Sequence, residues 1–281
     1  MAKHPAEIFG RPTGKGAQLP VKGPKRYWCP FADDKCNKQS RLIRYPMGVC
    51  SVRYGADIVA LCPRRFLQKN IVFQNIADRY FNSRNDLVVF SEIGLSQIGT
   101  FDYVMVKHKP FSSEIEDFVV IEFQTGQTTG TGKLVQALKD CLKGKEVEGE
   151  SYGFGLNLAD IWKRSFTQIL NKGIVLENWG HKIFWVIQEP VYQNFLNRYQ
   201  LNGMTYNKEH ATVFVIFDLI PESGQYELVN TRMESSTIDD LFRAFRNNPN
   251  IPPKDAFISK LHTKLKAKME LKLEWQHDQL K

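Results

Sequence analysis

Two near-continuous apolar segments constrain the fold of this chain more than any other feature. They cover residues 182–188 (KIFWVIQ) and 212–220 (TVFVIFDLI). A strand with apolar residues at consecutive positions buries both of its faces, which is typical of a sheet covered by helices on both sides. Pro190 indicates that a helix begins between the two segments. We therefore expect an α/β fold built on a mixed sheet flanked by helices.

The remaining elements follow from apolar periodicity and from capping residues. Strands are expected over residues 86–92, 101–106, 118–124 and 226–232, and helices over 71–84, 133–143 and 238–246. Asn157 is expected to cap a further helix that ends at Gly173. The Lys-rich segment 254–281 predicts a charged terminal helix, with Leu261, Leu265, Met269 and Leu273 near helical spacing.

The composition excludes several classes of protein. The mean hydropathy is −0.36, and no uncharged apolar run approaches the roughly 18 residues that a membrane span needs. The first 16 residues have no apolar core of a secretory signal. An aromatic content of 12% argues against a disordered chain. We expect a folded, soluble, cytoplasmic protein that makes no contact with a membrane.

The positive charge is concentrated in the first quarter of the chain. Residues 1–70 hold 14 Lys and Arg against 4 Asp and Glu, whereas residues 71–281 hold 24 against 26. A concentrated basic surface attracts polyanions such as nucleic acid, although a merely solvated face is the equal alternative. Residues 1–27, rich in Gly, Pro and Lys, predict an extended arm. We expect two parts, a basic region over 1–70 and a larger domain over 71–281.

Four of the five cysteines fall within 34 residues, at Cys29, Cys36, Cys50 and Cys62. Reduced thiols clustered in this way suggest a tetrahedral Zn²⁺ or Fe site, although the spacing C-x6-C-x13-C-x11-C is not the familiar C-x2-C. The segment has few apolar residues, so a metal would replace a core of its own. The alternative is four ordinary buried thiols. Cys141, on an expected helix, is assigned to the core.

The sharpest chemical pattern joins GTFDY (99–103) to VVIEFQ (119–124). Glu122 and Gln124 lie two apart on one strand, so they project from the same face. A carboxylate inside the run FVVIEF is costly unless it is paired or binds a metal. If the two strands form a hairpin, Asp102 and Glu122 can bind one Mg²⁺, with Gln124 holding water or phosphate. Glu92 is a further candidate contact. The alternative is structural acids at strand ends.

The Gly-rich run GQTTGTGKL (126–134) resembles a phosphate-binding loop but fails its rule. Thr131 stands where the second Gly should be, and Leu134 follows Lys133 in place of Ser or Thr. We therefore expect no nucleotide cofactor, and a flexible loop that can approach DNA. On the helix after Asn157, the side chains of Lys163, Arg164 and Gln168 are expected opposite the apolar stripe, as a solvated face. The alternative is that Lys163 or Arg164 contacts a phosphate.

Taken in order, the segments WCPF, GVCSV, LCPRRF, GTFDY and EFQTGQTTGTG resemble the NotI-type restriction endonucleases, a branch of the PD-(D/E)xK nucleases. The resemblance spans most of the chain. It implies a homodimer that cleaves double-stranded DNA with Mg²⁺ at a GC-rich palindrome with a GGCC-like centre. It assigns Asp102, Glu122 and Gln124 to catalysis, with Gln124 where the superfamily has Lys, and Glu92 to an additional acidic position. Cys29, Cys36, Cys50 and Cys62 match the family's metal ligands, with iron reported there.

We therefore expect a type II restriction endonuclease whose N-terminal cations embrace the DNA. The alternatives are a non-catalytic, metal-stabilised DNA-binding protein and a repair or structure-selective nuclease. The expected DNA contacts are Arg11, Lys15, Lys22, Lys25, Arg26, Arg41, Arg44, Arg53, Arg64 and Arg65.

Overall fold

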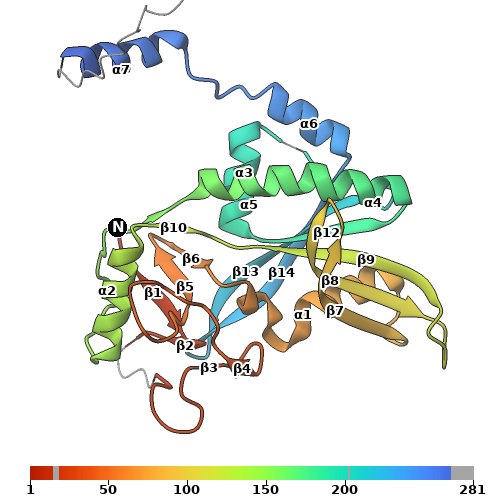
Figure 1. Ribbon diagram of the computed structural model, residues 1–281, viewed down its shortest axis with the longest axis horizontal. Coiled ribbons are helices and arrows are strands. Elements are labelled where there is room, and N and C mark those ends of the chain that lie inside the picture. Colours follow the sequence, from red (N-terminus) through yellow and green to blue (C-terminus); the bar gives the residue numbers. More distant parts are fainter. Residues whose placement is uncertain (15–18, 202, 267–281) are drawn as a thin grey trace, which may run out of the picture.

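The computed structural model describes residues 1–14, 19–201 and 203–266, and a six-stranded mixed sheet runs through it (Figure 1). The strand order is β14-β13-β12-β9-β8-β7. β12 runs parallel to β9 and β13, and the other neighbours are antiparallel. The strands are β7 (Leu87–Leu95), β8 (Gly99–His108), β9 (Ile115–Gln124), β12 (Lys182–Gln188), β13 (Thr212–Glu222) and β14 (Gln225–Ser236).

The two apolar segments form β12 and β13, which lie side by side near the middle of the sheet. Successive side chains of β12 enter two separate hydrophobic clusters. Trp185 and Ile187 belong to the first, and Phe184 and Val186 to the second. Because both faces are covered, the strand needs no polar alternation, which confirms the expected α/β sheet flanked by helices.

Helices from different parts of the chain cover the two faces. The first face packs against α3 (Leu158–Gln168), α4 (Ile174–Trp179), α5 (Glu189–Tyr199) and α6 (Ile238–Arg246). The second packs against η1 (Pro63–Asn70), α1 (Ile71–Ile76) and η2 (Ala77–Phe81). Within the described residues, no helix combines the length and apolarity needed to cross a membrane.

Two further helices lie at the margins of the molecule. α2 (Thr131–Leu142) packs Leu134 and Leu138 into the first cluster. α7 (Lys254–Lys266) extends away from the body (Figure 1), with Leu261 and Leu265 exposed. Met269 and Leu273, expected on the same helix, lie outside the described residues.

The N-terminal residues form a second sheet, so the expected extended arm is wrong for this part of the chain. The sheet has the order β2-β1-β5-β6, with β1 (Lys3–Ile8), β2 (Arg11–Pro12), β5 (Val49–Tyr54) and β6 (Asp57–Ala60). Ile8, Val49 and Val52 are buried in the same cluster as Trp185. The segment therefore shares the main core, in keeping with the expectation that it has no core of its own. The division at residue 70 stays a prediction.

Gln188, the last residue of β12, and Gly126, two residues after β9, connect this sheet to the large one. The Gln188 amide, at the end of β12, accepts from Ala60 N at 2.8 Å and donates to the Ile58 carbonyl. Gly126 N donates to Ala60 O at 2.8 Å, and a Cβ on Gly126 would lie 2.7 Å from Val59 Cγ1. These contacts hold β6 against the carboxyl end of β9.

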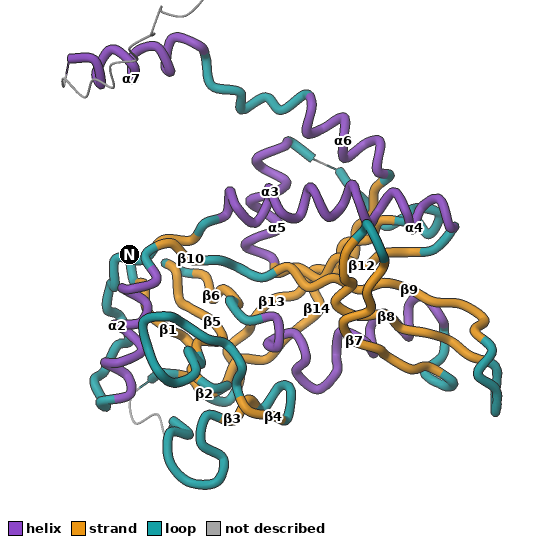
Figure 2. Tube along the Cα trace, in the orientation of Figure 1, coloured by secondary structure: helices purple, strands orange, loops and turns teal. Residues whose placement is uncertain are grey.

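The helix after Asn157 does not stop at Gly173, contrary to expectation. α3 continues through a π-helical turn, η3 (Ile169–Gly173), into α4, and Gly180 with φ +73° ends it (Figure 2). A Cβ on Gly173 would lie 2.6 Å from Ile238 Cδ1. This glycine therefore serves close packing against α6.

Candidate functional site

The hairpin of β8 and β9 brings Asp102 and Glu122 together. Tyr103 pairs with Ile121, so Asp102 and Glu122 lie on neighbouring positions of the two strands. Asp102 N lies 3.4 Å from Glu122 Oε1, and Asp102 Oδ2 accepts from Phe123 N at 2.8 Å. The pairing of these strands is confirmed, and with it the side-by-side placement of the two acids.

The two carboxylates differ in their surroundings. Glu122 is 1% exposed, whereas Asp102 is half-buried and lines a cleft. Burial and, after it, the nearby charge of Asp102 raise the pKa of Glu122 to about 7, against the opposing effect of Lys172. A buried acid beside a second acid is a frequent arrangement in active sites.

Gln124 is fixed by the helix that covers it. Its Oε1 accepts from Ser165 Oγ at 2.7 Å, and its Nε2 donates to Gln168 Oε1 at 3.0 Å. Gln168 was expected on a solvated face, which is wrong, because it points to β9. The sequence patterns did not single out Lys172 as a site residue. In the structure, its Nζ lies 2.7 Å from Glu122 Oε1.

The sequence contains a signal for the polar face of the helix that covers β9. Ser165, Gln168 and Lys172 are spaced by three and four residues, the spacing of neighbours on one helix face. Polar residues at that spacing beside an apolar stripe indicate a helix that meets a polar patch of the sheet.

Glu92 lies close to the two acids without contacting them. Ser91 pairs with Tyr103 and Ile93 with Phe101, so Glu92 stands opposite Asp102 as an unpaired position of β7. Its φ of +55° is uncommon for a residue with a side chain. Glu92 is exposed, and no hydrogen bond joins it to Asp102 or Glu122 in the described part of the chain.

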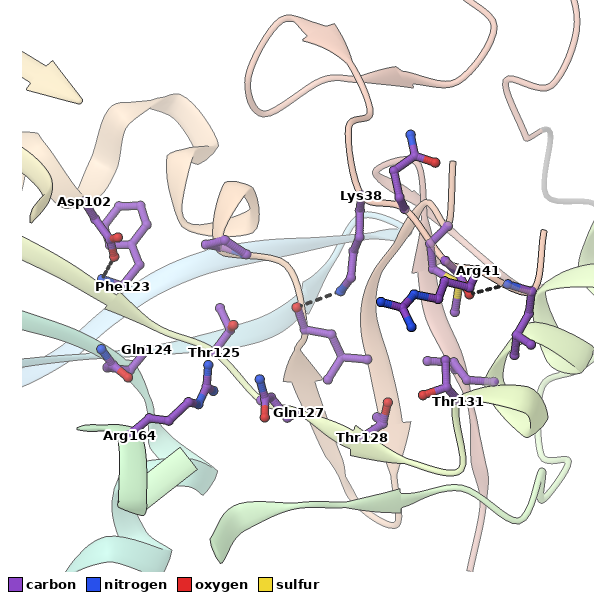
Figure 3. A pocket seen from close by; sticks show the side chains of 18 of the residues that line it. Lys38, Arg41, Asp102, Phe123, Gln124, Thr125, Gln127, Thr128, Thr131 and Arg164 are labelled. Carbon is purple, nitrogen blue, oxygen red and sulfur yellow. Dashed lines mark hydrogen bonds between the residues drawn. The ribbon is translucent and has the colours of Figure 1, made fainter. Parts of the chain in front are cut away.

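A cleft of about 810 Å³ opens beside these residues (Figure 3). Asp102 and Gln124 lie on its β9 side, and Lys38 and Arg41 come from the loop after Cys36. Arg164 of α3 completes the cationic lining, with the Gln127 amide facing its guanidinium at 2.9 and 3.1 Å from two nitrogens. The cleft lining therefore contains three cations and Asp102, whereas the buried Glu122 does not line it.

Most of the expected DNA-contacting cations lie elsewhere. Arg41 alone of that set lines the cleft, and Lys15 lies outside the described residues. Arg65 is fully buried, with its Nε 2.8 Å from Glu7 Oε2, so its assignment to DNA is wrong. Ser51 Oγ donates to the same carboxylate at 2.7 Å. Arg65 thus ties η1 to the N-terminal sheet.

Two hairpins bring the clustered cysteines toward one another. Cys29 and Cys36 flank the hairpin of β3 (Trp28–Cys29) and β4 (Asp34–Lys35). Cys50 and Cys62 flank the β5–β6 hairpin, where Cys62 N donates to Cys50 O at 3.2 Å. Burial raises the pKa of Cys50, and the charges of Glu7, Cys62 and Cys29 add to the rise.

All five cysteines are unpaired thiols, and Cys141 packs against the main core. Among the residues described, no group of three or more His, Cys, Asp or Glu side chains has an arrangement that could hold a metal ion. This applies to the four cysteines and to the acidic pair with Glu92 alike.

The Gly-rich run is structured, and the expectation of a flexible loop is wrong. Thr128–Thr129 form β10, which pairs with β11 (Gly155–Leu156), and α2 begins at Thr131. Lys133 is exposed on the first turn of α2.

Comparison with protein families identifies the chain. The model of the family "Restriction endonuclease NotI" matches residues 16–228, which include both acids, Gln124, Lys172 and the four clustered cysteines. The chain belongs to the NotI restriction endonuclease family. It is therefore a type II restriction endonuclease, a site-specific deoxyribonuclease that acts on double-stranded DNA. None of the curated proteins compared with the chain matches it.

The raised pKa of Glu122 predicts a pH-dependent effect on stability. A carboxyl group whose pKa is higher in the folded than in the unfolded chain loses stabilising free energy as the pH rises. Because the pKa of Glu122 is about 7, the stability of Glu122→Gln relative to that of the parent should rise between about pH 5 and pH 8. We expect a gain on the order of 2 kcal/mol in the free energy of unfolding, measured with urea in EDTA.

The Asp102→Asn background is the control, because it removes one of the charges that raise the pKa. The pH-dependent gain should be smaller there. A stability difference that is the same at both pH values in the parent background would contradict the prediction.

Proposed function

We propose that this NotI-family enzyme hydrolyses DNA in a Mg²⁺-dependent reaction at a GC-rich palindrome with a GGCC centre. Asp102 and Glu122 are the proposed metal ligands, Gln124 orients a water or a phosphate, and Glu92 is a further contact. The observation that carries the proposal is the approach of Asp102 to Glu122 at the edge of a cleft with cations in its lining. We place the site in the PD-(D/E)xK superfamily, with Gln124 as the variant position.

The two acids suit a hard divalent cation. Each has one oxygen held by the protein, since Phe123 N donates to Asp102 Oδ2 and Lys172 to Glu122 Oε1. In the described part of the chain, no hydrogen bond reaches the other oxygen of either acid. Mg²⁺ often takes one or two carboxylates and fills its remaining positions with water and phosphate.

When bound, Mg²⁺ lowers the pKa of a coordinated water and stabilises charge on the phosphate. Gln124 cannot act as a base, and its carbonyl oxygen already accepts from Ser165. One amide hydrogen is committed to Gln168, which leaves the second for a water or a phosphate oxygen. We therefore assign Gln124 the role of a fixed donor. Attack in line on phosphorus would leave a 5′-phosphate and a 3′-hydroxyl.

The lining of the cleft suits a nucleic-acid backbone and base edges. Arg164 reaches it from α3 and Arg41 from the loop after Cys36, and Arg41 is exposed. We assign Arg164 to a phosphate and Arg41 to guanine O6 and N7 in the major groove. A palindrome presents two equivalent strands, so we propose a homodimer with one site per strand.

We also propose that Cys29, Cys36, Cys50 and Cys62 hold one Fe or Zn ion as four thiolates. The support is that two hairpins bring the four thiols into one neighbourhood, where Cys29 and Cys36 both raise the pKa of Cys62. Burial raises the pKa of Cys50 and of Cys62, and a metal bound by the four thiols would displace their protons. Residues 1–70 would then be a metal-stabilised part attached to a nuclease domain over 71–281.

The central prediction concerns cleavage. Purified protein should cut long DNA into discrete bands with Mg²⁺ and not with EDTA, and end mapping should give a GGCC-centred site. Asp102→Asn should lower the single-turnover rate by a factor on the order of 10³, because it removes a metal ligand. Glu116→Gln, an exposed acid of the same hairpin, is the matched control. Smears or junction-only cutting would favour a repair nuclease instead.

The cleft cations should separate affinity from sequence discrimination. Arg164→Ala should weaken binding to all sequences and lower the slope of log K against log salt by about 0.9. Arg41→Ala should relax discrimination by about 1–3 kcal/mol at one base pair. Arg79→Ala, an exposed arginine of η2, should change neither. Equal losses for Arg41→Ala at cognate and altered sites would overturn its assignment to base reading.

The cysteine site predicts one tightly held Fe or Zn per chain by elemental analysis. Cys50→Ser should lose that metal and lower the unfolding temperature by several degrees or more, because metal binding stabilises the fold. Cys141→Ser should retain the metal, since Cys141 lies on α2 outside the cluster. Metal-free protein after purification without chelators would contradict the assignment.

A further inference from the structure

Lys172 is a buried lysine that contacts the acidic pair directly. Its ammonium donates to Glu122 Oε1 at 2.7 Å and to Thr100 O at 2.7 Å, and its side chain is only 5% exposed. The ring of Phe101 lies 5.4 Å from the same Nζ. These three contacts span β9 and the start of β8, the two strands that carry the acids.

The π-helical turn η3 presents this side chain. Lys172 is the fourth residue of the turn, which interrupts an otherwise regular helix from Leu158 to Trp179. Such turns insert an extra residue and change which side chains face the sheet, and they are frequent at functional sites. Gly173 allows the turn to pack against Ile238 and Thr212. Apolar packing of the helix against the sheet does not by itself require this irregular turn.

The ion pair is a costly choice for structural purposes alone. A buried Lys–Glu pair loses the hydration of both charges, and apolar residues of similar volume often stabilise a fold equally well. The neighbours of Glu122 on the opposite face, Ile121 and Phe123, are apolar and buried. The carboxylate of Glu122 therefore points to a role in the chemistry of the site. The ammonium of Lys172 offsets the cost of burying that carboxylate.

The contact also sets how the two acids face each other. Lys172 holds Oε1 of Glu122 and leaves Oε2 for another ligand. Through Thr100 O, it also fixes the backbone two residues before Asp102. Strand β9 itself supplies no cation near Glu122, because Gln124 occupies the next position on that face. Within the described residues, Lys172 is the one side chain that donates to Glu122.

We propose that Lys172 is the positioning residue of the nuclease site: from a π-helical turn it orients Glu122 and fixes β8, so that Glu122 is held beside Asp102, which lines the cleft. This inference rests on the proposed function. Lys172 acts through Glu122 and does not line the cleft. Its role is therefore to hold the ligands in place, and we assign it no contact with DNA.

The first test needs no cleavage. Urea unfolding in EDTA is measured for the parent, Lys172→Met, Glu122→Gln and the double variant. Lys172→Met leaves a buried carboxylate without its partner, so its unfolding midpoint should fall. The double variant should recover much of that loss, because neither charge remains. Additive effects of the two substitutions would show that the pair is not coupled, which would overturn the proposal.

The second test separates positioning from folding. With folded protein and the same DNA, Lys172→Met should lower the single-turnover rate in Mg²⁺ by about 100-fold or more. DNA affinity in Ca²⁺ should change by less than about 3-fold, because Lys172 does not reach the cleft. Lys172→Arg, which keeps a charged donor, should recover at least about 10-fold of the lost rate.

Lys109→Met is the matched control. Lys109 forms an exposed ion pair with Glu114, 2.5 Å apart, at the far end of the same hairpin, so neither rate nor stability should change. If Lys172→Met does not fold, Lys172→Gln replaces it in the second test, because its amide is uncharged and one atom shorter than the lysine and so no longer holds Glu122 as the ammonium does. A parent-like cleavage rate in either variant would overturn the positioning role. Failure of the parent to cut any DNA would instead reject the proposed function, and the unfolding cycle would still decide the pairing.

Discussion

A carboxylate buried in the face of a central sheet is the constraint on which the rest of this structure depends. Glu122 is almost inaccessible to water, in a strand whose other face buries Val119, Ile121 and Phe123 in an apolar cluster. Such a charge requires a partner, and Lys172 supplies it from the helix above. That requirement explains why the helix crosses β9 with Ser165, Gln168 and Lys172 toward the sheet. The same contacts orient Glu122 and Gln124 beside Asp102.

The N-terminal part of the chain forms the side of the cleft that lies across from Asp102 and Gln124. Gln188 and Gly126 fasten β6 to the ends of β12 and β9, and the loop after Cys36 then carries Lys38 and Arg41 to the cleft. Arg65 also ties η1 to the N-terminal sheet, through its buried ion pair with Glu7. The acids and the cations therefore come from parts of the chain about 40 residues or more apart. Cleft geometry depends on how the two sheets are joined, and the four cysteines lie in the segment that makes the joint.

Local sequence predicts what depends on local periodicity. The strands β12 and β13 follow from runs of consecutive apolar residues. The β8–β9 hairpin and the shared face of Glu122 and Gln124 follow from side-chain alternation along strands. The tertiary partners were not predictable in this way. From the sequence, Arg65 is expected to be a surface cation, because nothing local shows that β1 places Glu7 beside it. Gly173 is expected to end a helix, because nothing local shows that Ile238 occupies the space where a side chain would lie. Lys172 reads as a solvated lysine because a π-helical turn is not visible in the spacing of apolar residues.

The central claim is that Asp102 and Glu122 jointly hold a divalent ion against the scissile phosphate. A crystal structure of the parent enzyme with its target DNA and Ca²⁺, or with Mn²⁺ located by anomalous scattering, tests it most directly. The account predicts an ion bound by one oxygen from each acid and by a phosphate oxygen, with Lys172 still on Glu122. An ion bound elsewhere, or a scissile phosphate distant from both carboxylates, would contradict it.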